Sequence, residues 1–195
     1  MSMRYAIGFL AAFALLAVVG LIVIYTGAYN VAATEPHAKI ARWALDTTFH
    51  NSVRARSDER AVQPELVEAA DLRTGFQEFQ EYCVHCHGAP GVKPAGWISG
   101  MTPHPPELSR VAGEWSPDEI FWIVKHGVKM SGMPPFGDTE SDEAIRSIAA
   151  FVNRMDGMTP QQYRQLQQQW GGGEGHHGGS GSGSHAQMTN PSNSS

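Results

Sequence analysis

The sequence has 195 residues, enough for one modest domain and some additional segments. Its formal net charge of -5 argues against a nucleic-acid role, because binding to phosphates requires a basic face. It contains only two cysteines, Cys83 and Cys86, which limits the cysteine chemistry to one disulfide, half of a zinc site or one covalent cofactor attachment.

The first predicted element is an apolar run of 21 residues without a charge, from Tyr5 to Tyr25. As a helix this run would extend over about 31 Å, which matches the hydrocarbon core of a bilayer. Arg4 precedes it, as expected for an N-terminus that stays in the cytoplasm. We therefore predict an uncleaved membrane anchor over residues 1–28. A cleaved signal peptide ending near residues 31–33 is the alternative, and both interpretations send the rest of the chain across the membrane.

Residues 29–70 are predicted to connect the anchor to a globular domain. Pro36 is placed to open a helix that carries Ile40, Trp43 and Phe49 at roughly helical spacing. Basic residues flank this helix, namely Lys39, Arg42, Arg54, Arg56 and Arg60. Three interpretations stay open for the segment: a helix lying on lipid headgroups, a docking segment for a partner subunit, and an ordered connector.

The globular domain is predicted over residues 71–157 and is expected to be all-α, because no strand pattern is visible. Apolar periodicity predicts three helices, at about 71–82, 117–126 and 141–155. Ser116 is a plausible N-cap of the second helix, with Glu119 three residues later. The stretch 88–113 is rich in Gly and Pro and is expected to be a loop.

Two further segments follow the domain. A short amphipathic helix is predicted within residues 158–170, with Thr159 as its N-cap. Residues 171–195 are Gly/Ser-rich and are predicted to be a disordered tail. The histidines of the tail are expected to be solvated rather than to bind metal; they are His176, His177 and His185.

The motif that carries chemistry is Cys83-Val84-His85-Cys86-His87, which reads C-x-x-C-H, the attachment signature of a c-type heme. Two thiols one helical turn apart add across the porphyrin vinyl groups, and His87 then faces the iron as the proximal ligand. A redox dithiol is disfavoured because no βαβ pattern surrounds the motif. Zinc is disfavoured because these residues would wrap one ion poorly, and a disulfide would be strained in a helical turn. We predict one covalently bound heme c.

The second axial position requires a ligand from elsewhere in the chain or an open site. Met133 is the best candidate, because a thioether is a soft ligand and the two prolines that follow stiffen the loop around it. Met130 is the fallback. More remote candidates are His104 and His126. Core packing, the usual role of a methionine, is the alternative for Met133.

Beyond the motif, residues 71–157 resemble the small, mostly helical class I cytochromes c. In that family the first helix carries a Gly eight residues and an aromatic four residues before the first heme cysteine; here these are Gly75 and Phe79. The last helix carries an aliphatic and, three residues later, an aromatic, as Ile148 and Phe151 do. The resemblance implies that the two helices pack crosswise, with Gly allowing close approach of the backbones, and that Met133-Pro134 belongs to the distal Met loop.

The same resemblance implies a proline carbonyl that accepts a bond from the proximal His ring, and a leucine two residues later that touches the heme. Pro106 and Leu108 fit this P-x-L pattern, and Pro90 remains a rival. The residues expected to build the heme pocket or the helix contacts behind it are Phe79, Ile120, Val124, Phe136, Ile148 and Phe151. The lysines expected near the exposed heme edge are Lys93, Lys125 and Lys129, for which plain solvation is the alternative.

The wider chain is similar to bacterial membrane-anchored monoheme cytochromes, including subunits of respiratory oxidases and dehydrogenases. This implies a non-enzymatic carrier of single electrons between respiratory or photosynthetic partners such as a quinol-oxidising complex, a dehydrogenase or a terminal oxidase. The heme domain is expected to face the periplasm from the inner membrane, without a small-molecule substrate or nucleic acid. The alternative is an open-site heme protein with a peroxidase or gas-sensing role.

Overall fold

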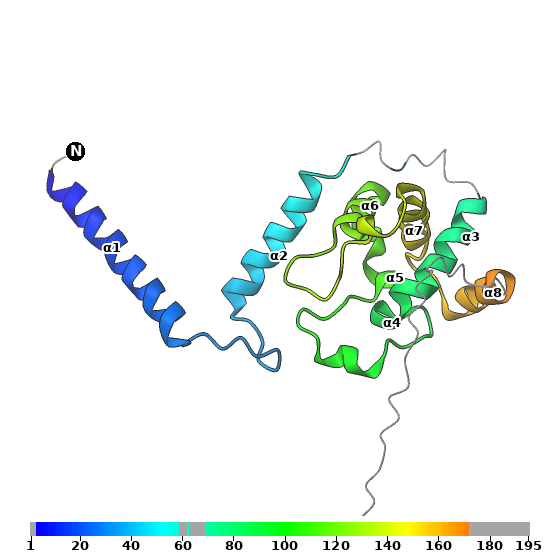
Figure 1. Ribbon diagram of the computed structural model, residues 1–195, viewed down its shortest axis with the longest axis horizontal. Coiled ribbons are helices and arrows are strands. Elements are labelled where there is room, and N and C mark those ends of the chain that lie inside the picture. The colour runs from blue at the N-terminus through cyan, green and yellow to red at the C-terminus, as the bar shows by residue number, and fades with distance from the viewer. Residues whose placement is uncertain (1–2, 59–61, 63–68, 172–195) are drawn as a thin grey trace, which may run out of the picture.

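The computed structural model describes residues 3–58, 62 and 69–171. Within these residues the chain is helical and forms no strand, apart from one isolated bridge between Ala89 and Val92. The α-helices are α1 (Met3–Thr26), α2 (Lys39–Arg54), α3 (Ala69–Glu78), α4 (Val84–His87), α5 (Leu108–Val111), α6 (Pro117–His126), α7 (Asp142–Arg154) and α8 (Pro160–Trp170). The shorter elements are the π-helical turn η2 (Phe79–Cys83) and the 3-10 turns η3 (Gly96–Gly100), η4 (Ala112–Glu114) and η5 (Phe136–Asp138). Figure 1 shows α3 to α8 gathered into one body.

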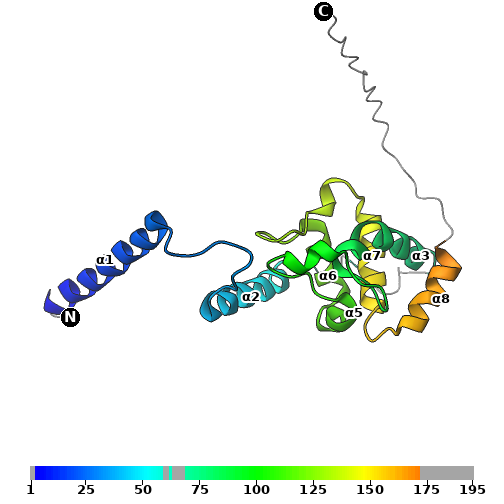
Figure 2. The ribbon, with the colours of Figure 1, turned by 90° about the horizontal axis from the view of Figure 1, so that it is seen from below.

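The apolar helix α1 stands apart from that body in Figures 1 and 2. All of its side chains are exposed, and it is the one helix in the described part of the chain that is long and apolar enough to cross a membrane. A signal sequence near an N-terminus has the same length and composition. The helix covers the whole predicted run from Tyr5 to Tyr25.

Helix α2 begins at Lys39, three residues later than predicted, because Pro36 lies outside the helix and Ala38 occupies the N-cap position. Its C-terminal half packs on the body. The His50 ring stacks on the indole of Trp115 at a centroid distance of 4.7 Å, and Phe49 meets the same indole edge-on. Val53 is fully buried. The predicted basic residue Arg60 lies outside the described residues, whereas Arg54 pairs with Glu119 across the contact at 3.7 Å.

A buried hydrogen bond also joins the connector to the start of α6. The carboxylate of Asp118 accepts a hydrogen bond of 2.6 Å from the backbone N–H of Val62, and both residues are buried. Asp118 lies in the first turn of α6, where the helix dipole favours a negative charge. The single carboxylate therefore satisfies a buried donor that is 56 residues away in the sequence.

Replacing Asp118 with Ala is expected to lower the free energy of unfolding by about 1–3 kcal/mol, because the Val62 N–H then stays buried without an acceptor. Urea unfolding of the heme-loaded protein measures this loss. Asp118→Asn is the matched control, since it keeps an acceptor oxygen and is expected to lose less than the Ala variant. Equal losses for the two variants would contradict the role assigned to the hydrogen bond.

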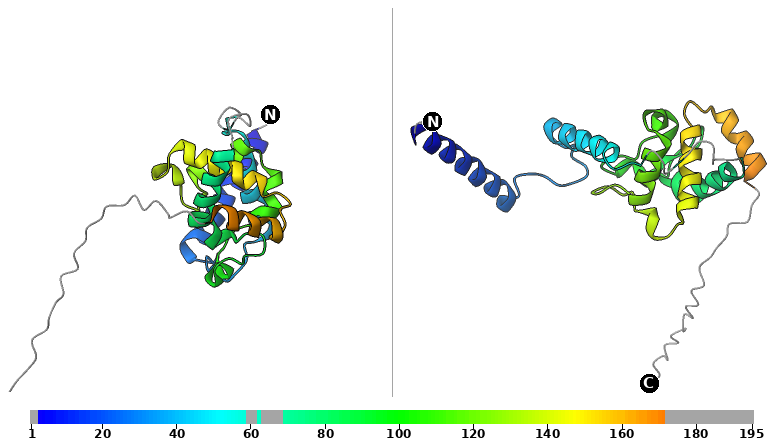
Figure 3. Two further views of the ribbon diagram at one scale, coloured as in Figure 1. Left: turned by 90° about the vertical axis from the view of Figure 1, so that its right-hand side faces the viewer. Right: turned by 90° about the horizontal axis from the view of Figure 1, so that it is seen from above.

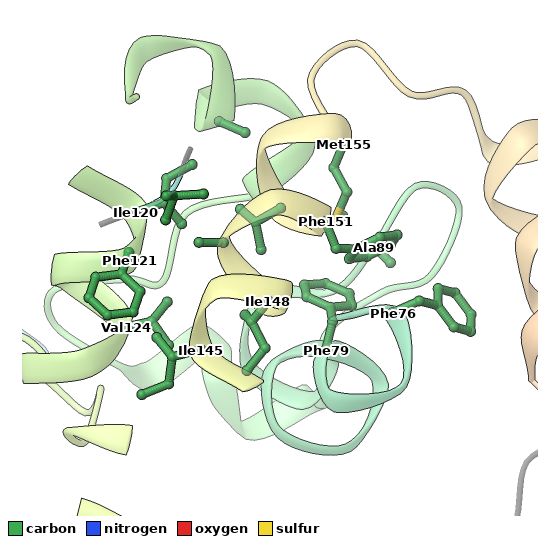
Figure 4. Packing of buried hydrophobic residues seen from close by; sticks show 14 of the residues in the cluster. Phe76, Phe79, Ala89, Ile120, Phe121, Val124, Ile145, Ile148, Phe151 and Met155 are labelled. Atoms are coloured by element: carbon green, nitrogen blue, oxygen red, sulfur yellow. The ribbon is translucent and has the colours of Figure 1, made fainter. Parts of the chain in front are cut away.

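The core forms where α3 and η2 cross α7. The side chains of Phe76 and Phe79 meet Phe151 at ring distances of 5.4 and 5.5 Å, and all three are fully buried. Gly75 makes the crossing possible, because a Cβ atom at this position would overlap the carbonyl of Ser147 on α7. Figure 4 shows Phe79 and Phe151 between the two helices, with Ile148 beside them. The crosswise packing implied by the class I resemblance is therefore present.

Helix α6 covers the other side of α7. Ile120, Phe121 and Val124 are buried against it, as Figure 4 shows. The helix spans the predicted residues, and its capping box is formed by Ser116 and Glu119 as predicted. Because Ser116 precedes a proline at the first helical position, local sequence alone defines where this helix starts.

The expectation that residues 88–113 form a loop is wrong in part. Three short helical segments interrupt the stretch, namely η3, α5 and the start of η4. Each has only three to five residues. A segment of one turn is too short to show a hydrophobic period. The high Gly and Pro content of the stretch therefore predicted only a loop.

Helix α8 lies across the outside of α3 (Figure 3). It begins after a capping box formed by Thr159 and Gln162, so the predicted N-cap is confirmed. Tyr163 is fully buried, and its hydroxyl oxygen accepts a hydrogen bond of 2.7 Å from Gln80. The predicted disordered tail with its three histidines lies outside the described residues, except for Gly171.

Candidate heme-binding site

The C-x-x-C-H motif lies where a π-helical turn passes into α4. Cys83 ends the π-helical turn η2, and the remaining residues of the motif form α4. The Val84 N–H bonds to the Phe79 carbonyl, five residues back, so the helix makes one wider turn just before the motif. One additional residue rotates the following side chains by about 100° about the helix axis. The two cysteines and His87 share one helical turn by their spacing, and the wider turn before them changes the direction in which this turn faces.

The imidazole of His87 is held in one orientation. Its Nδ1 atom lies 2.8 Å from the carbonyl oxygen of Pro106, and since a carbonyl only accepts, Nδ1–H is the donor. The Nε2 lone pair is therefore free to bind a metal. Burial lowers the pKa of His87, the Pro106 bond opposes this, and nearby His104 lowers it further. The ring is thus neutral near pH 7, as an iron ligand must be.

Both cysteines are free thiols, and no disulfide joins them. Burial, followed by the proximity of Cys86 and of Glu78, raises the pKa of Cys83 to about 12. A redox-active dithiol or a zinc thiolate needs a lowered thiol pKa, so this environment suits neither. It suits a sulfur that is used in a neutral thioether bond.

The loop after His87 is tightly folded. Gly88 has a φ of 63°, and a Cβ atom there would come within 2.7 Å of the Val92 carbonyl oxygen, so the turn requires glycine. The Ala95 N–H bonds to the His85 carbonyl at 2.9 Å and closes the loop onto the motif. Pro90 is buried in this turn, whereas the carbonyl that meets His87 comes from Pro106. Leu108 follows at the start of α5 and packs, half-buried, against the core.

The loop that carries Met133 is pinned at its base. Val128 N–H bonds to the Met133 carbonyl at 3.2 Å, and the Ser131 hydroxyl bridges the turn by donating to Val128 O and accepting from Met133 N–H. Gly127 ends α6 with a φ of 64°, and a Cβ atom there would collide with the backbone of residues 133–135. The loop is therefore folded back against the end of α6 with little freedom to move Met133.

The two candidate methionines differ sharply in their surroundings. Met133 is half-buried and packs against the core, whereas Met130 is 85% exposed and has a φ of 60° at the tip of the loop. A third methionine, Met101, was not singled out by the sequence. It ends η3, and its methyl group lies against Gly132, so that a Cβ at Gly132 would overlap it. No local pattern links residues 101 and 132, so only their proximity in the fold identifies Met101.

The remaining candidates from the sequence have other contacts. The His104 Nδ1 atom lies 3.2 Å from the Ile98 carbonyl oxygen, and the His126 ring packs on the indole of Trp122 at 4.9 Å. Lys125 is not a free surface lysine, because its ammonium donates to both carboxylate oxygens of Asp142 at 2.7 and 2.9 Å. This hydrogen bond lowers the pKa of Asp142. Of the three lysines predicted near the heme edge, Lys93 and Lys129 are exposed.

The residues predicted to build the heme pocket or the helix contacts behind it belong to the hydrophobic core or pack against it. Phe79, Ile148 and Phe151 come from the α3/α7 crossing, and Phe136 lies half-buried after the Met loop. Ile120 and Val124 contribute the α6 side. The donor set thus combines two free thiols and an imidazole with a free Nε2, beside an apolar core, which fits a covalently attached heme. The fold and this motif together define a c-type cytochrome.

The comparisons with known proteins agree with this class. Residues 70–152 match the family model for Cytochrome C oxidase, cbb3-type, subunit III, and this match covers most of the helical body that holds the motif. The chain is 30% identical over 105 residues to the Cbb3-type cytochrome c oxidase subunit FixP of Rhizobium meliloti (strain 1021), covering 49% of this chain and 33% of that protein. The subunit of the same name from Sinorhizobium medicae (strain WSM419) is also 30% identical over 105 residues. The chain therefore spans about a third of the length of the curated relatives it matches.

Proposed function

We propose that this chain carries single electrons to a terminal oxidase of the cbb3 type, as a membrane-anchored cytochrome with one heme c. The observation that carries the proposal is the imidazole of His87, oriented by Pro106 next to the two free thiols, beside a pinned loop that bears Met133. Cys83 and Cys86 are the covalent attachment points, His87 and Met133 the axial ligands, and Pro106 and Leu108 line the pocket. Heme c, when bound, supplies a one-electron iron couple.

The residues of the chain favour a carrier over a catalyst. The hydrogen bond to Pro106 fixes the ring plane of His87 and makes its Nε2 atom a more basic metal ligand. The pinned loop holds Met133 half-buried, which supports a closed distal side. Phe79, Ile148 and Phe151 keep water from the interior of the domain and so favour the less charged, reduced form of the iron.

An exposed apolar surface supports contact with a redox partner. Trp97 on η3 is 65% exposed, and Met130 at the tip of the Met loop is 85% exposed. Their elements meet where Met101 contacts Gly132, so the two side chains belong to neighbouring loops. Exposed large apolar groups of this kind are typical of protein contacts. Lys93 and Lys129 are the exposed charges on the same two loop regions.

Membrane association is supported by α1 and by the family match. We place the domain on the periplasmic side of a bacterial inner membrane, because Arg4 precedes the apolar helix and positive residues stay in the cytoplasm. The identity of the oxidase rests on the names of the relatives. One heme follows from the single C-x-x-C-H motif in this sequence.

The Met133→Ala variant tests the assigned ligation. Oxidised heme with a Met sulfur ligand shows a weak near-infrared band, and we expect this band to be lost in Met133→Ala. The reduction potential is expected to fall by on the order of 0.1–0.3 V, because axial ligands set potentials over a range of about 0.8 V. Optical spectra and redox titration of the full chain measure both effects.

Met130→Ala and Met101→Ala are the matched controls, since both remove a thioether from the same region and are expected to keep the band.

Carbon monoxide binding distinguishes a six-coordinate electron carrier from an open-site heme protein. The reduced wild-type protein is expected to show no spectral shift with carbon monoxide. A high-spin wild-type spectrum with ready carbon monoxide binding would replace the carrier with an open-site protein that has a peroxidase or gas-sensing role.

A further inference from the structure

The N-terminal half of α2 presents a face with apolar and basic side chains, which also carries the exposed carboxylate of Asp46. Ile40 and Trp43 lie three positions apart, hence on one side of the helix, and they are 69% and 64% exposed. Lys39 and Arg42 directly precede them and are also exposed. Among the residues that the structure describes, neither basic side chain takes part in a salt bridge. This face is called the α2 face below.

The α2 face is rigidly connected to the heme domain. The C-terminal half of the same helix is fixed by the stack of His50 on Trp115 and by the buried side chain of Val53. Figures 2 and 3 show α2 extending from the domain toward α1, with its N-terminal end furthest from the domain. Whatever covers the α2 face therefore sets the orientation of the whole domain.

The connector holds the α2 face close to the end of α1. Tyr29 lies three residues after α1 ends, and its hydroxyl is 2.7 Å from Nδ1 of His37, two residues before α2 begins. The two rings also stack at 6.3 Å. The connector is thus folded on itself rather than extended, and α2 starts beside the point where a membrane-spanning α1 would leave the hydrocarbon core.

We propose that the α2 face lies on the bilayer that holds α1, with Ile40 and Trp43 at the level of the headgroups and Lys39 and Arg42 on anionic phospholipids. Tryptophan is enriched at this depth, and long basic side chains reach phosphates while their stems stay on apolar surface. Basic residues next to a membrane helix are attracted by anionic lipid. A lipid surface is favoured over a protein because the folded connector keeps the α2 face at the membrane. The inference rests on the anchoring of α1 in the proposed function.

Hydroxyl-radical footprinting of the full, heme-loaded chain in lipid nanodiscs tests the proposal. Trp97 is the internal control, because it is 65% exposed and Trp43 is 64% exposed. In nanodiscs that contain phosphatidylglycerol, we expect Trp43 to be oxidised about fivefold more slowly than Trp97, because the interface covers it. No partner protein is present, so a protein-docking face predicts equal rates for the two indoles, and equal rates overturn the proposal.

Charge reversal tests the lipid chemistry. The double variant Lys39→Glu and Arg42→Glu is expected to bring the two oxidation rates to within about twofold of each other, because the attraction to anionic lipid is lost. The matched control, Lys93→Glu with Lys129→Glu, makes the same charge change on the heme domain and is expected to leave the protection of Trp43 intact. Undiminished protection in the Lys39/Arg42 variant overturns the assigned lipid contact. If the chain does not remain with the nanodiscs, the proposed membrane anchoring of α1 is wrong. If the chain is retained but Trp43 is unprotected, only the proposed lipid contact of the α2 face is wrong.

Discussion

The double variant Cys83→Ser and Cys86→Ser is expected to lose covalent heme entirely, because a serine hydroxyl does not form thioether bonds with the vinyl groups. Heme staining after denaturing electrophoresis measures the loss, since only covalently attached heme stays with the chain. Each single variant is expected to keep one thioether. Heme held by one thioether absorbs at a longer wavelength in alkaline pyridine than heme held by two. The double variant is also expected to yield little folded protein, because the attached heme would complete the core against which Cys83 packs.

His85→Ala is the matched control for these variants. His85 belongs to the same motif and lies between the two cysteines, but its side chain is exposed. Its contact to Ala95 uses the backbone carbonyl, which the substitution keeps. Full heme staining is therefore expected for His85→Ala. Stained protein from the double Cys variant would refute the proposed attachment.

Gly75→Ala is expected to destabilise the heme-loaded protein by about 3 kcal/mol or more, at the upper end of overpacking effects. The added methyl group would overlap the Ser147 carbonyl and come within 3.0 Å of the Phe151 Cβ atom. The obstacle is backbone of α7, which cannot rotate away as a side chain can. Denaturant unfolding followed by helical circular dichroism measures the difference, with the Soret band as a second signal.

Gly96→Ala is the control for this variant, because a Cβ atom at Gly96 meets nothing within 4 Å. Both substitutions restrict the unfolded chain in the same way, so the difference between them reports the folded state alone. A change within about 0.5 kcal/mol is expected for Gly96→Ala. Similar stability for the two variants would mean that the stability of the folded protein does not depend on the close approach of α3 and α7.

The sequence predicted those features whose signals are local. The N-terminus of α6 is defined by Ser116, a proline and Glu119 within four consecutive residues, and the structure forms that capping box. The α3/α7 crossing was implied by the resemblance to class I cytochromes c, which rests on the positions of Gly75 and Phe79 relative to the motif. The all-α class was predicted because the apolar period is helical throughout the domain.

Other features were not predictable, because they depend on contacts between distant residues or on changes in backbone geometry. The π-helical turn η2 leaves the apolar pattern of α3 intact, so the sequence indicated an ordinary helix. Lys125 looked like a surface charge until the fold brought Asp142 to its ammonium, 17 residues later. The sequence favoured Met133 over Met130 because of the two prolines that follow it, but it gave no sign that Met130 lies exposed at the tip of the loop. The sequence alone does not contain that geometry.

The folded connector of residues 27–38 has a consequence for how tightly the cytochrome must hold its partner. The bridge between Tyr29 and His37 shortens the tether, and the contact of His50 with Trp115 removes the freedom of α2. Where α1 and a redox partner belong to one complex, a short tether of this kind gives an effective concentration in the millimolar range. A contact with a dissociation constant of about 1 mM is then already half-occupied. Rapid electron exchange is thus compatible with an interface too weak to survive purification in detergent.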